Sequence, residues 1–541
     1  MKIFSKIVLS FVCTSLLVLS SCKKYEDLKK ISSTAWNPNL AVPLAHATFG
    51  VYDVLAAVDS TDLIIIDPVS GEIGLVYSSE IGSFGSAEIV DLGNVVQNIF
   101  INTIELDLPT IPSFSASVSS SNPQTIQLNT ANGVEVHTVL FNSGLLDLHF
   151  ESSIQHNLEI TITFPTLLDA NGDPIVRTIS TNFTAGDPLP QVADLQIDLT
   201  NLSGDFTLGG TSFNQMSVDV ETTITGTGQP VFGAETFNFD ITSSNFSFEN
   251  VIGYFGQQNV AQQADSVLIK IFQNASNGTF ELQNPKIDFF IDNSFGFPVD
   301  INLGNLQSIN VNTNQTVALG VNDNIINVIP SPGLGQSAIT NFQLNTSNTT
   351  NLSEVISPTP KYFYYEVDAT ANPLGNTGIP NFIEDDSKFT LRAEVNMPLD
   401  GLAYGFTISD TVDFEFSQNT DLIESIMFRL IADNGFPVQL GTQLRAIDSN
   451  GNTVFTIFDT PENVVEPAPV NSNGVVSSSR QKITDINLNE VQINQLKNVK
   501  KLIIYGEAST TEAQNGVFVK FFDYYKFGLK VAMQVQGSTS F

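Results

Sequence analysis

The chain has 541 residues and a formal net charge of −34, from 22 basic and 56 acidic side chains. This acidity argues against nucleic acid or an anionic membrane surface as a partner, because both need basic patches. With 42% hydrophobic residues the chain is too apolar to be disordered, and its length predicts two to four domains or an elongated array.

The N-terminus has the three zones of an export signal. Lys2 and Lys6 provide a basic start, and residues 7–19 form an apolar run of 13 residues. That run is too short for a membrane-spanning helix, which needs about 20 residues. A short apolar run behind a basic start indicates a signal peptide, here residues 1–21.

The next feature is the sequence Leu19-Ser20-Ser21-Cys22, which resembles the bacterial lipobox. The resemblance implies cleavage before Cys22, a diacylglycerol on its thiol and acylation of the new amino group. Several acyl chains hold a protein stably on a membrane, whereas one binds only marginally. The alternative is an ordinary signal peptide followed by a chance cysteine. Cys13 lies in the removed segment, so the mature chain has no second cysteine for a disulfide.

Strand signals dominate the rest of the chain. Residues 63–66 and 73–77 predict two strands around a turn. In residues 158–164 the first, third, fifth and seventh positions are apolar, which predicts a strand with one buried face. Short helices are expected at residues 51–58 and 488–496.

This pattern predicts an all-β fold of tandem or fused antiparallel β-sandwich-like domains, with few short helices, after the lipoprotein signal peptide. The domains are expected to follow one another along the chain. Residues 22–35 form a tether, 36–120 an N-terminal β region, 121–330 a middle β-sandwich region and 331–541 a C-terminal β-sandwich region.

An internal repeat is visible at residues 286–301 and 426–440, with a looser copy at 145–164. Each copy is a strand, a polar break and another strand, and the first two contain Phe-Pro. Pro298 and Pro437 cannot donate a ladder hydrogen bond, so both are expected at strand starts or edges. Common turn chemistry in β-sandwiches is the alternative explanation.

A further set of segments lies at residues 36–38, 41–44, 251–256, 284–298, 393–399 and 433–437. Together they resemble a group of uncharacterised cell-envelope lipoproteins from Bacteroidetes. That resemblance implies a location in the cell envelope, and it brings no chemistry or site residues with it. A weaker likeness to water-stress-type β-sandwich domains concerns the fold alone.

Catalytic signatures are missing from the sequence. It contains no GxSxG, HExxH, Walker-type or GxGxxG motif. The chain has four histidines, and they are expected to be ordinary strand or turn residues rather than metal ligands. The sequence therefore predicts neither an enzyme nor a cofactor. The histidines are His46, His137, His149 and His156.

One short segment offers a candidate calcium site. Asp169, Asn171 and Asp173 place oxygen ligands at alternate positions, which resembles the first part of a calcium loop. A full loop needs a later bidentate acid, and residues 174–177 supply none. The alternative is a plain hairpin turn, and residues 448–452 have the same pattern in weaker form.

Two functions are compatible with these observations. The first is a lipid-anchored cell-envelope protein with a structural or binding role, whose partner is the membrane through Cys22 and an unidentified envelope protein or glycan. The second is a periplasmic or outer-membrane carrier of an apolar ligand, lined by some of the 40 phenylalanines. Lys23 after the cysteine fits transport to the outer membrane, with the body facing the periplasm or the cell surface.

Overall fold

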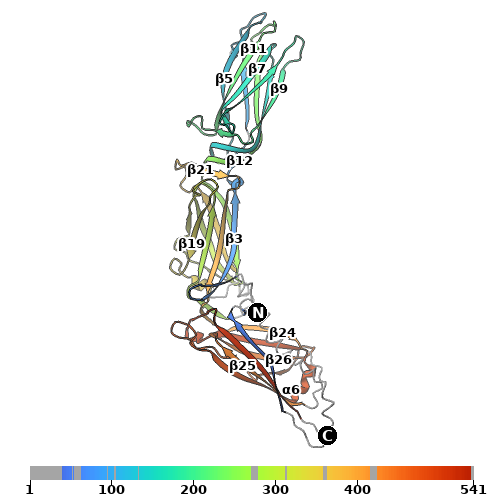
Figure 1. Cartoon of the computed structure of the whole chain (residues 1–541), viewed down its shortest axis with the longest axis vertical. Coiled ribbons are helices and arrows are strands. Elements are labelled where there is room, and N and C mark those ends of the chain that lie inside the picture. Colours follow the sequence, from blue (N-terminus) through green and yellow to red (C-terminus); the bar gives the residue numbers. More distant parts are fainter. Residues whose placement is uncertain are drawn as a thin grey trace.

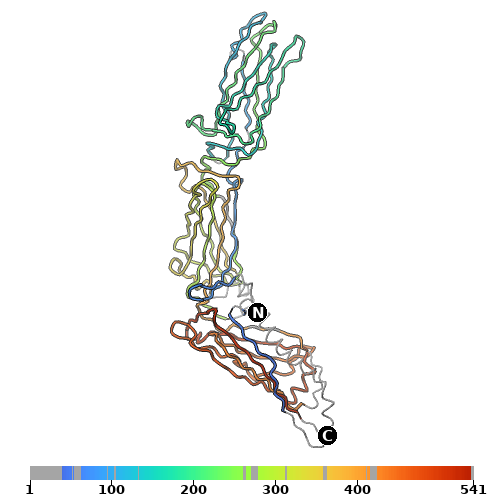
Figure 2. The backbone as a smooth tube through the Cα atoms, in the orientation of Figure 1, coloured from blue at the N-terminus to red at the C-terminus, as the bar shows by residue number. Residues whose placement is uncertain are grey.

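A computed structural model describes residues 39–51, 53, 63–93, 95–102, 105–131, 133–269, 278–310, 314–356, 362–414 and 423–537. Three β-sandwiches lie end to end and form a rod that bends at its lowest member (Figures 1 and 2). The predicted all-β fold with few short helices is confirmed. The signal peptide, Cys22 and the tether lie outside the described residues, and no described helix is long and apolar enough to cross a membrane.

The lowest sandwich, which we call the base, combines the start and the end of the described chain. One sheet has the order β1 (Asn39–Gly50), β32 (Lys526–Gly537), β25 (Ile423–Asn434) and β29 (Arg480–Asn489). The second has the order β24 (Phe406–Asp413), β30 (Lys501–Thr510), β26 (Val438–Ile447) and β27 (Thr453–Thr456), and β28 (Glu462–Val465) also pairs with β26.

The middle sandwich has two sheets of the same kind. The first has the order β19 (Ala338–Leu344), β15 (Lys286–Asn293), β22 (Lys388–Pro398), β3 (Ile73–Gly85) and β2 (Ile64–Ile66). The second has the order β13 (Gln258–Leu268), β20 (Tyr362–Ala371), β16 (Val299–Asn310) and β17 (Gln315–Ala318), and β18 (Ile325–Val328) also pairs with β16.

The uppermost, or distal, sandwich is built from one continuous stretch of chain. One side has the order β4 (Val96–Asn102), β12 (Thr236–Tyr254), β6 (Glu135–Ser152) and β9 (Gln191–Asp198). The other has the order β5 (Ser117–Gln127), β11 (Gln215–Thr225), β7 (Asn157–Leu168) and β8 (Pro174–Thr181). The short strand β10 (Ser203–Asp205) pairs with both β6 and β7.

All three sandwiches have one strand order. If the strands of each are numbered along the chain, one sheet reads 1-8-3-6 and the other 2-7-4-5. In the base and the middle sandwich two short strands share the fifth position, and β2 adds an edge to the middle sandwich. Eight antiparallel strands in two sheets with this order form a jelly roll. The rod is therefore a series of three jelly rolls.

The jelly rolls are nested rather than consecutive. Strand 1 of the base, β1, is followed by the middle and distal sandwiches before strand 2, β24, begins. Strand 1 of the middle sandwich, β3, is followed by the distal sandwich before strand 2, β13. The linear division expected from the sequence differs from this arrangement, since residues 36–120 supply strands to all three sandwiches. A hydrophobic pattern shows that β1 is a strand but not that Asn39 pairs with Gln536.

The two closest copies of the repeat take the same place in their jelly rolls, between strands 3 and 4. Asn293 and Asn434 end these third strands and are almost completely buried. The side-chain oxygen of each accepts a hydrogen bond from the backbone two residues later, at Phe295 (3.0 Å) and Phe436 (2.9 Å). Each thereby fixes the crossing of the chain from one sheet to the other. Pro298 stands directly before β16, and Pro437 stands directly before β26.

Several local predictions are confirmed. Strands β2 and β3 form the expected hairpin, in which Ile64 pairs with Leu75. The apolar positions of residues 158–164 are all buried, so β7 has one face in the core. The late helix is α6 (Glu490–Gln495), capped by the Asn489 side chain. The expected helix at residues 51–58 lies mostly outside the described residues. The other short helices are α4 (Ser86–Ile89) and α5 (Leu352–Ile356).

The joints between the sandwiches are made of paired backbone. β12 pairs with β6 in the distal sandwich and with β21 (Asn381–Glu384) at the top of the middle one. One hydrophobic cluster continues through both. Between the middle sandwich and the base lies a small sheet of β14 (Thr279–Leu282), β23 (Asp400–Tyr404) and β31 (Val519–Lys520).

Candidate functional site

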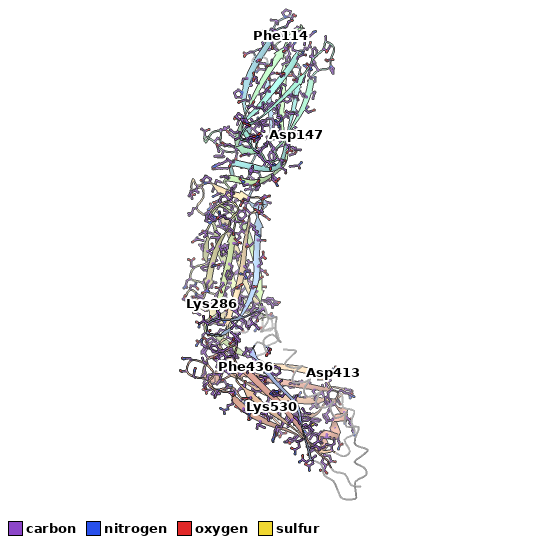
Figure 3. The ribbon with its side chains drawn as sticks, in the orientation of Figure 1. Phe114, Asp147, Lys286, Asp413, Phe436 and Lys530 are labelled. Carbon is purple, nitrogen blue, oxygen red and sulfur yellow. The ribbon has the colours of Figure 1, made fainter. Side chains whose placement is uncertain are left out.

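A shallow hollow of about 800 Å³ lies on the flank of the distal sandwich, over β4, β12, β6 and β9. In β6, Leu148 and Phe150 point into the core, so Asp147 and His149 point outward by the alternation of a strand. Figure 3 labels Asp147 on this flank. The sheet therefore presents a continuous polar face to solvent.

Strand register brings four polar residues of this face into one row. Asp240 of β12 stands opposite both Asn98 of β4 and His149 of β6. His149 in turn stands opposite Asp194 of β9. Directly opposite residues have Cβ atoms about 5 Å apart, so each side chain reaches its neighbour.

Hydrogen bonds connect the row and its surroundings. Asn98 Nδ2 donates to Asp240 Oδ1. His149 Nδ1 lies 2.6 Å from Asp194 Oδ1, and His149 Nε2 lies 3.4 Å from Glu151 Oε1. In the next row Gln196 Nε2 donates to Asp147 Oδ1 over 2.7 Å. We call these residues, together with Thr242, the polar face.

The polar face is acidic and has apolar edges. Its four carboxylates accompany one imidazole, so acceptors outnumber donors and anionic groups are repelled. Three apolar side chains on the same side of the sheet flank it and are half exposed or more: Val96 (71%), Phe100 (56%) and Val192 (50%). Such a surface suits hydroxyl groups or cations, with apolar contacts along its rims.

The charge of the face depends on His149. The hydrogen bond to Asp194 raises the pKa of His149, and Glu151 adds to this, while slight burial opposes it. The imidazole is thus protonated over a wider pH range than an isolated histidine. As pH rises through this raised pKa, the imidazole loses its proton and the face becomes more acidic.

We expect a histidine titration followed by NMR to give His149 a pKa above 6.5, its ordinary value. Asp194→Asn should move the midpoint back down, whereas Asp219→Asn on the opposite sheet should not. Because the folded-state pKa is raised, any stabilisation is complete at acidic pH and lost as pH rises through that pKa. With His149 40% and Asp194 76% exposed, it should not exceed about 1 kcal/mol. A midpoint at or below the ordinary value would contradict the geometry.

The proposed calcium residues form the turn between β7 and β8. Asp169 Oδ1 accepts hydrogen bonds from the backbone N–H groups of Asn171 (2.8 Å) and Asp173 (3.0 Å), which lower the pKa of Asp169. Asp448 binds the backbone of Asn450 and Asn452 in the same way. These are hairpin turns closed by a carboxylate.

Among the described residues there is no group of three or more histidine, cysteine or acidic side chains placed to hold a metal ion. Calcium at Asp169, Asn171 and Asp173 stays a prediction. It would be contradicted if millimolar calcium left the melting temperature of chelator-treated protein unchanged.

The other sequence candidates are not brought together. Cys22 lies outside the described residues, and His46 is on β1 of the base, far from the other three histidines. His156 is 1% exposed, packs against the ring of Phe114 and lies 3.1 Å from Thr227 Oγ1. Burial lowers the pKa of His156, which favours its neutral form in the core.

Sequence reasoning missed the polar face. Its members come from four segments spread over residues 96–242, and no motif links them. A signal did exist in two places: Asp147-Leu148-His149-Phe150-Glu151 and Asp194-Leu195-Gln196 alternate polar and apolar residues. That alternation predicts an outward polar row on each strand. It does not show that the two strands are neighbours.

Many of the described phenylalanines fill the interiors of the sandwiches. Phe150 stacks on Phe239 at 4.4 Å between ring centroids, and Phe84 stacks on Phe389 at 4.7 Å. Phe295 and Phe297 stack on each other and are fully buried. These side chains are occupied by core packing, which gives little support to a carrier lined by phenylalanine.

No protein-family model matches the sequence, and no curated protein matches it. Among solved structures it resembles a "putative secreted protein" from Parabacteroides distasonis, with 12% identity over 54% of this chain and 90% of that chain and a TM-score of 0.29. It also resembles infectious bursal virus derived T=1 particles (10% identity, 90% and 80% coverage, TM-score 0.14). A third likeness is to the CBM22-1–CBM22-2 tandem domain of Paenibacillus barcinonensis Xyn10C (9% identity, 60% and 98% coverage, TM-score 0.14). Because each TM-score is low, these likenesses support no inference about family or function.

Proposed function

We propose that the chain is a non-catalytic, lipid-anchored cell-envelope protein that holds its distal jelly roll away from the membrane and binds an uncharged, hydroxyl-rich ligand on the polar face. The observation that carries the proposal is the position of this face. It lies in the jelly roll farthest from the point where the tether joins the fold (Figure 1).

The tether joins the base at Asn39, which pairs with Gln536. From there β1 runs toward the middle sandwich and ends at Gly50, beside Lys526. The 16 residues between Cys22 and Asn39 span at most about 55 Å when fully extended. Lipid on Cys22 would therefore keep the base near the membrane and direct the distal jelly roll away from it.

The chemistry of the face favours a glycan. Carboxylates of Asp147, Asp194 and Asp240 accept hydrogen bonds from hydroxyl groups, and a protonated His149 donates them. Apolar rims can contact the C–H surface of a sugar ring. Sulfated or phosphorylated ligands are disfavoured by the local negative charge. Ligand sites usually combine a few polar groups with apolar ones, as this face does.

Binding of the mature protein to an array of neutral glycans tests the ligand class. The double variant His149→Ala/Asp240→Ala should lower affinity for a bound glycan at least tenfold. The matched control is Glu221→Ala, an exposed acid on β11 in the opposite sheet of the same sandwich. Absence of glycan binding, or binding that the double variant leaves unchanged, would contradict the proposal. If the polar face bound basic peptides and not glycans, the proposed ligand class would be wrong.

Location is tested separately. Cys22→Ala should abolish lipid labelling and release the protein from the membrane fraction. Protease treatment of intact cells then distinguishes a surface-facing from a periplasmic body. An unlipidated, freely soluble wild-type protein would contradict the anchor while leaving the binding experiment interpretable.

A further inference from the structure

We infer that the protein also transmits tension: a pull between Cys22 and the distal jelly roll runs along the first strands of the two lower jelly rolls and leaves both of them folded. The inference deepens the proposed function, since it rests on anchorage at Cys22. It does not depend on which ligand the distal jelly roll binds.

The first element of this path is β1. It enters the base at the end far from the middle sandwich and leaves at the joint with it, so it runs the whole length of the base as one strand. A strand is already extended, at about 3.3 Å per residue. When its two ends are pulled in opposite directions, the backbone of β1 carries the tension along the base, and the other strands of the base receive it only at the joint.

The second element is the joint between β1 and β3. Gly50 pairs with Lys526, and just before Lys526 the backbone of Phe521 and Asp523 binds the start of the middle sandwich. Ile73 N donates to Phe521 O (2.9 Å), and Asp523 N donates to Gly71 O (3.0 Å). These bonds pass force from the top of the base directly to the beginning of β3.

Side chains reinforce the joint. Lys520 Nζ lies 3.2 Å from Glu72 and 3.1 Å from Asp400. A small hydrophobic cluster covers the same point, so the joint is partly shielded from water. It consists of Val51, Ile73, Phe522 and Tyr525.

The third element is β3, which repeats the geometry of β1 in the middle sandwich. It starts at the joint with the base and ends at Gly85, where α4 leads into the distal jelly roll. Ser86 Oγ at this end donates to Asp385 O over 2.7 Å. Figure 1 shows β3 lying lengthwise along the rod. Except for β2 at the joint, every other strand of the base and the middle sandwich follows the distal jelly roll in sequence and lies off the path.

The C-terminal end of the fold provides a natural contrast. Gly537 lies at the same end of the base as Asn39, because β32 pairs with β1 along its full length. The covalent path from Gly537 to the distal jelly roll nevertheless passes through all later strands of both lower sandwiches. Two attachment points at one end of the rod should therefore respond to force in opposite ways.

Single-molecule force spectroscopy can compare the two attachments in the full mature chain. The first form uses the unlipidated Cys22 thiol and Ala185→Cys, in an exposed turn of the distal jelly roll. The second combines Cys22→Ser and Ala185→Cys with a cysteine added after Phe541. Through Cys22 we expect only distal unfolding. Through the C-terminus we also expect the base and the middle sandwich to unfold, and the base alone releases roughly 450 Å for residues 406–537.

Release of the base or the middle sandwich through Cys22, at the force that releases them through the C-terminus, would overturn the inference. Lys520→Met provides a second test at the joint. When this variant is pulled from Cys22, it should extend early by up to about 75 Å, the length of residues 51–72. When it is pulled from the C-terminus, this early extension should be missing. A force–extension trace identical to that of the wild type would show that the joint does not carry the force. Because thiol handles replace both lipid and ligand, failure of the proposed function would not alter either result.

Discussion

Asn434→Ala should lower the free energy of unfolding of the base by about 3 kcal/mol or more. Asn434 is 1% exposed. The two hydrogens of its Nδ2 are shared among the carbonyl oxygens of Phe436 (3.0 Å), Val438 (2.8 Å) and Glu466 (2.8 Å), and its Oδ1 accepts from Phe436 N. Alanine removes all of these bonds at once. Phe436 O keeps a second donor, the Ala468 N–H (3.0 Å), and each buried group that is left unsatisfied costs about 1–3 kcal/mol. Urea denaturation followed by circular dichroism measures the change.

A matched control lies in the same sandwich. Asn450 is exposed in the turn after β26, and the turn is closed by the Asp448 side chain and the backbone N–H of residue 450. Asn450→Ala should therefore change stability by no more than about 0.5 kcal/mol. Asn293→Ala should reproduce the loss in the middle sandwich, because Asn293 Nδ2 donates to Phe297 O and Ile329 O. Equal stability of the Asn434 and Asn450 variants would contradict the role assigned to the repeat.

Lys520→Met should weaken the joint between the base and the middle sandwich by about 3 kcal/mol. The side chain of Asp400 is 6% exposed and lies 3.1 Å from Lys520 Nζ. Removing the ammonium leaves this carboxylate buried without a counter-charge, whereas Glu72 is more exposed and suffers less. Denaturation monitored separately in the two lower sandwiches should show that they no longer unfold together.

The pH dependence of this loss has a definite sign. Burial alone would lower the pKa of Lys520, but its hydrogen bonds to Asp400 and Glu72 outweigh burial and raise it. A raised lysine pKa stabilises the fold below 10.5, the ordinary value, and this stabilisation is lost as pH rises through the folded-state pKa. The difference between wild type and variant should thus stay constant from neutral to mildly alkaline pH.

Two variants serve as controls for the joint. Lys482→Met removes a pair with Glu466 at 3.5 Å, in which both side chains are about one-third exposed, and should cost less than about 1 kcal/mol. Lys520→Met combined with Asp400→Asn should recover much of the lost stability, since no buried charge is then left alone. If Lys520→Met and Lys482→Met cost the same, the joint is not held by a buried charge cluster.

Strand identity could be read from the sequence because it depends on neighbouring residues. The alternation in residues 158–164 reports that one face of β7 is buried, whatever β7 pairs with. The hairpin of β2 and β3 is equally local, since its partners are separated by a short turn. The two closest copies of the repeat were visible because a buried asparagine needs the same neighbours in each jelly roll.

Pairing over long separations could not be read in this way. Nothing near β1 indicates that its partner is β32, because both strands would look the same beside any other strand. The polar face was hidden for the same reason. His149 and Asp194 become neighbours only through the register of β6 with β9, and Asp240 only through that of β12.

Nesting also sets the order in which the chain can fold. β1 is made first among the described strands, yet β32, its partner, comes about 480 residues later. At roughly 5–20 residues per second, synthesis separates the two by about half a minute or more. The distal jelly roll, a continuous stretch, can close first, the middle one next and the base last. Until then β1 lacks its partner strand, so closure of the base marks a chain that has been translated through β32.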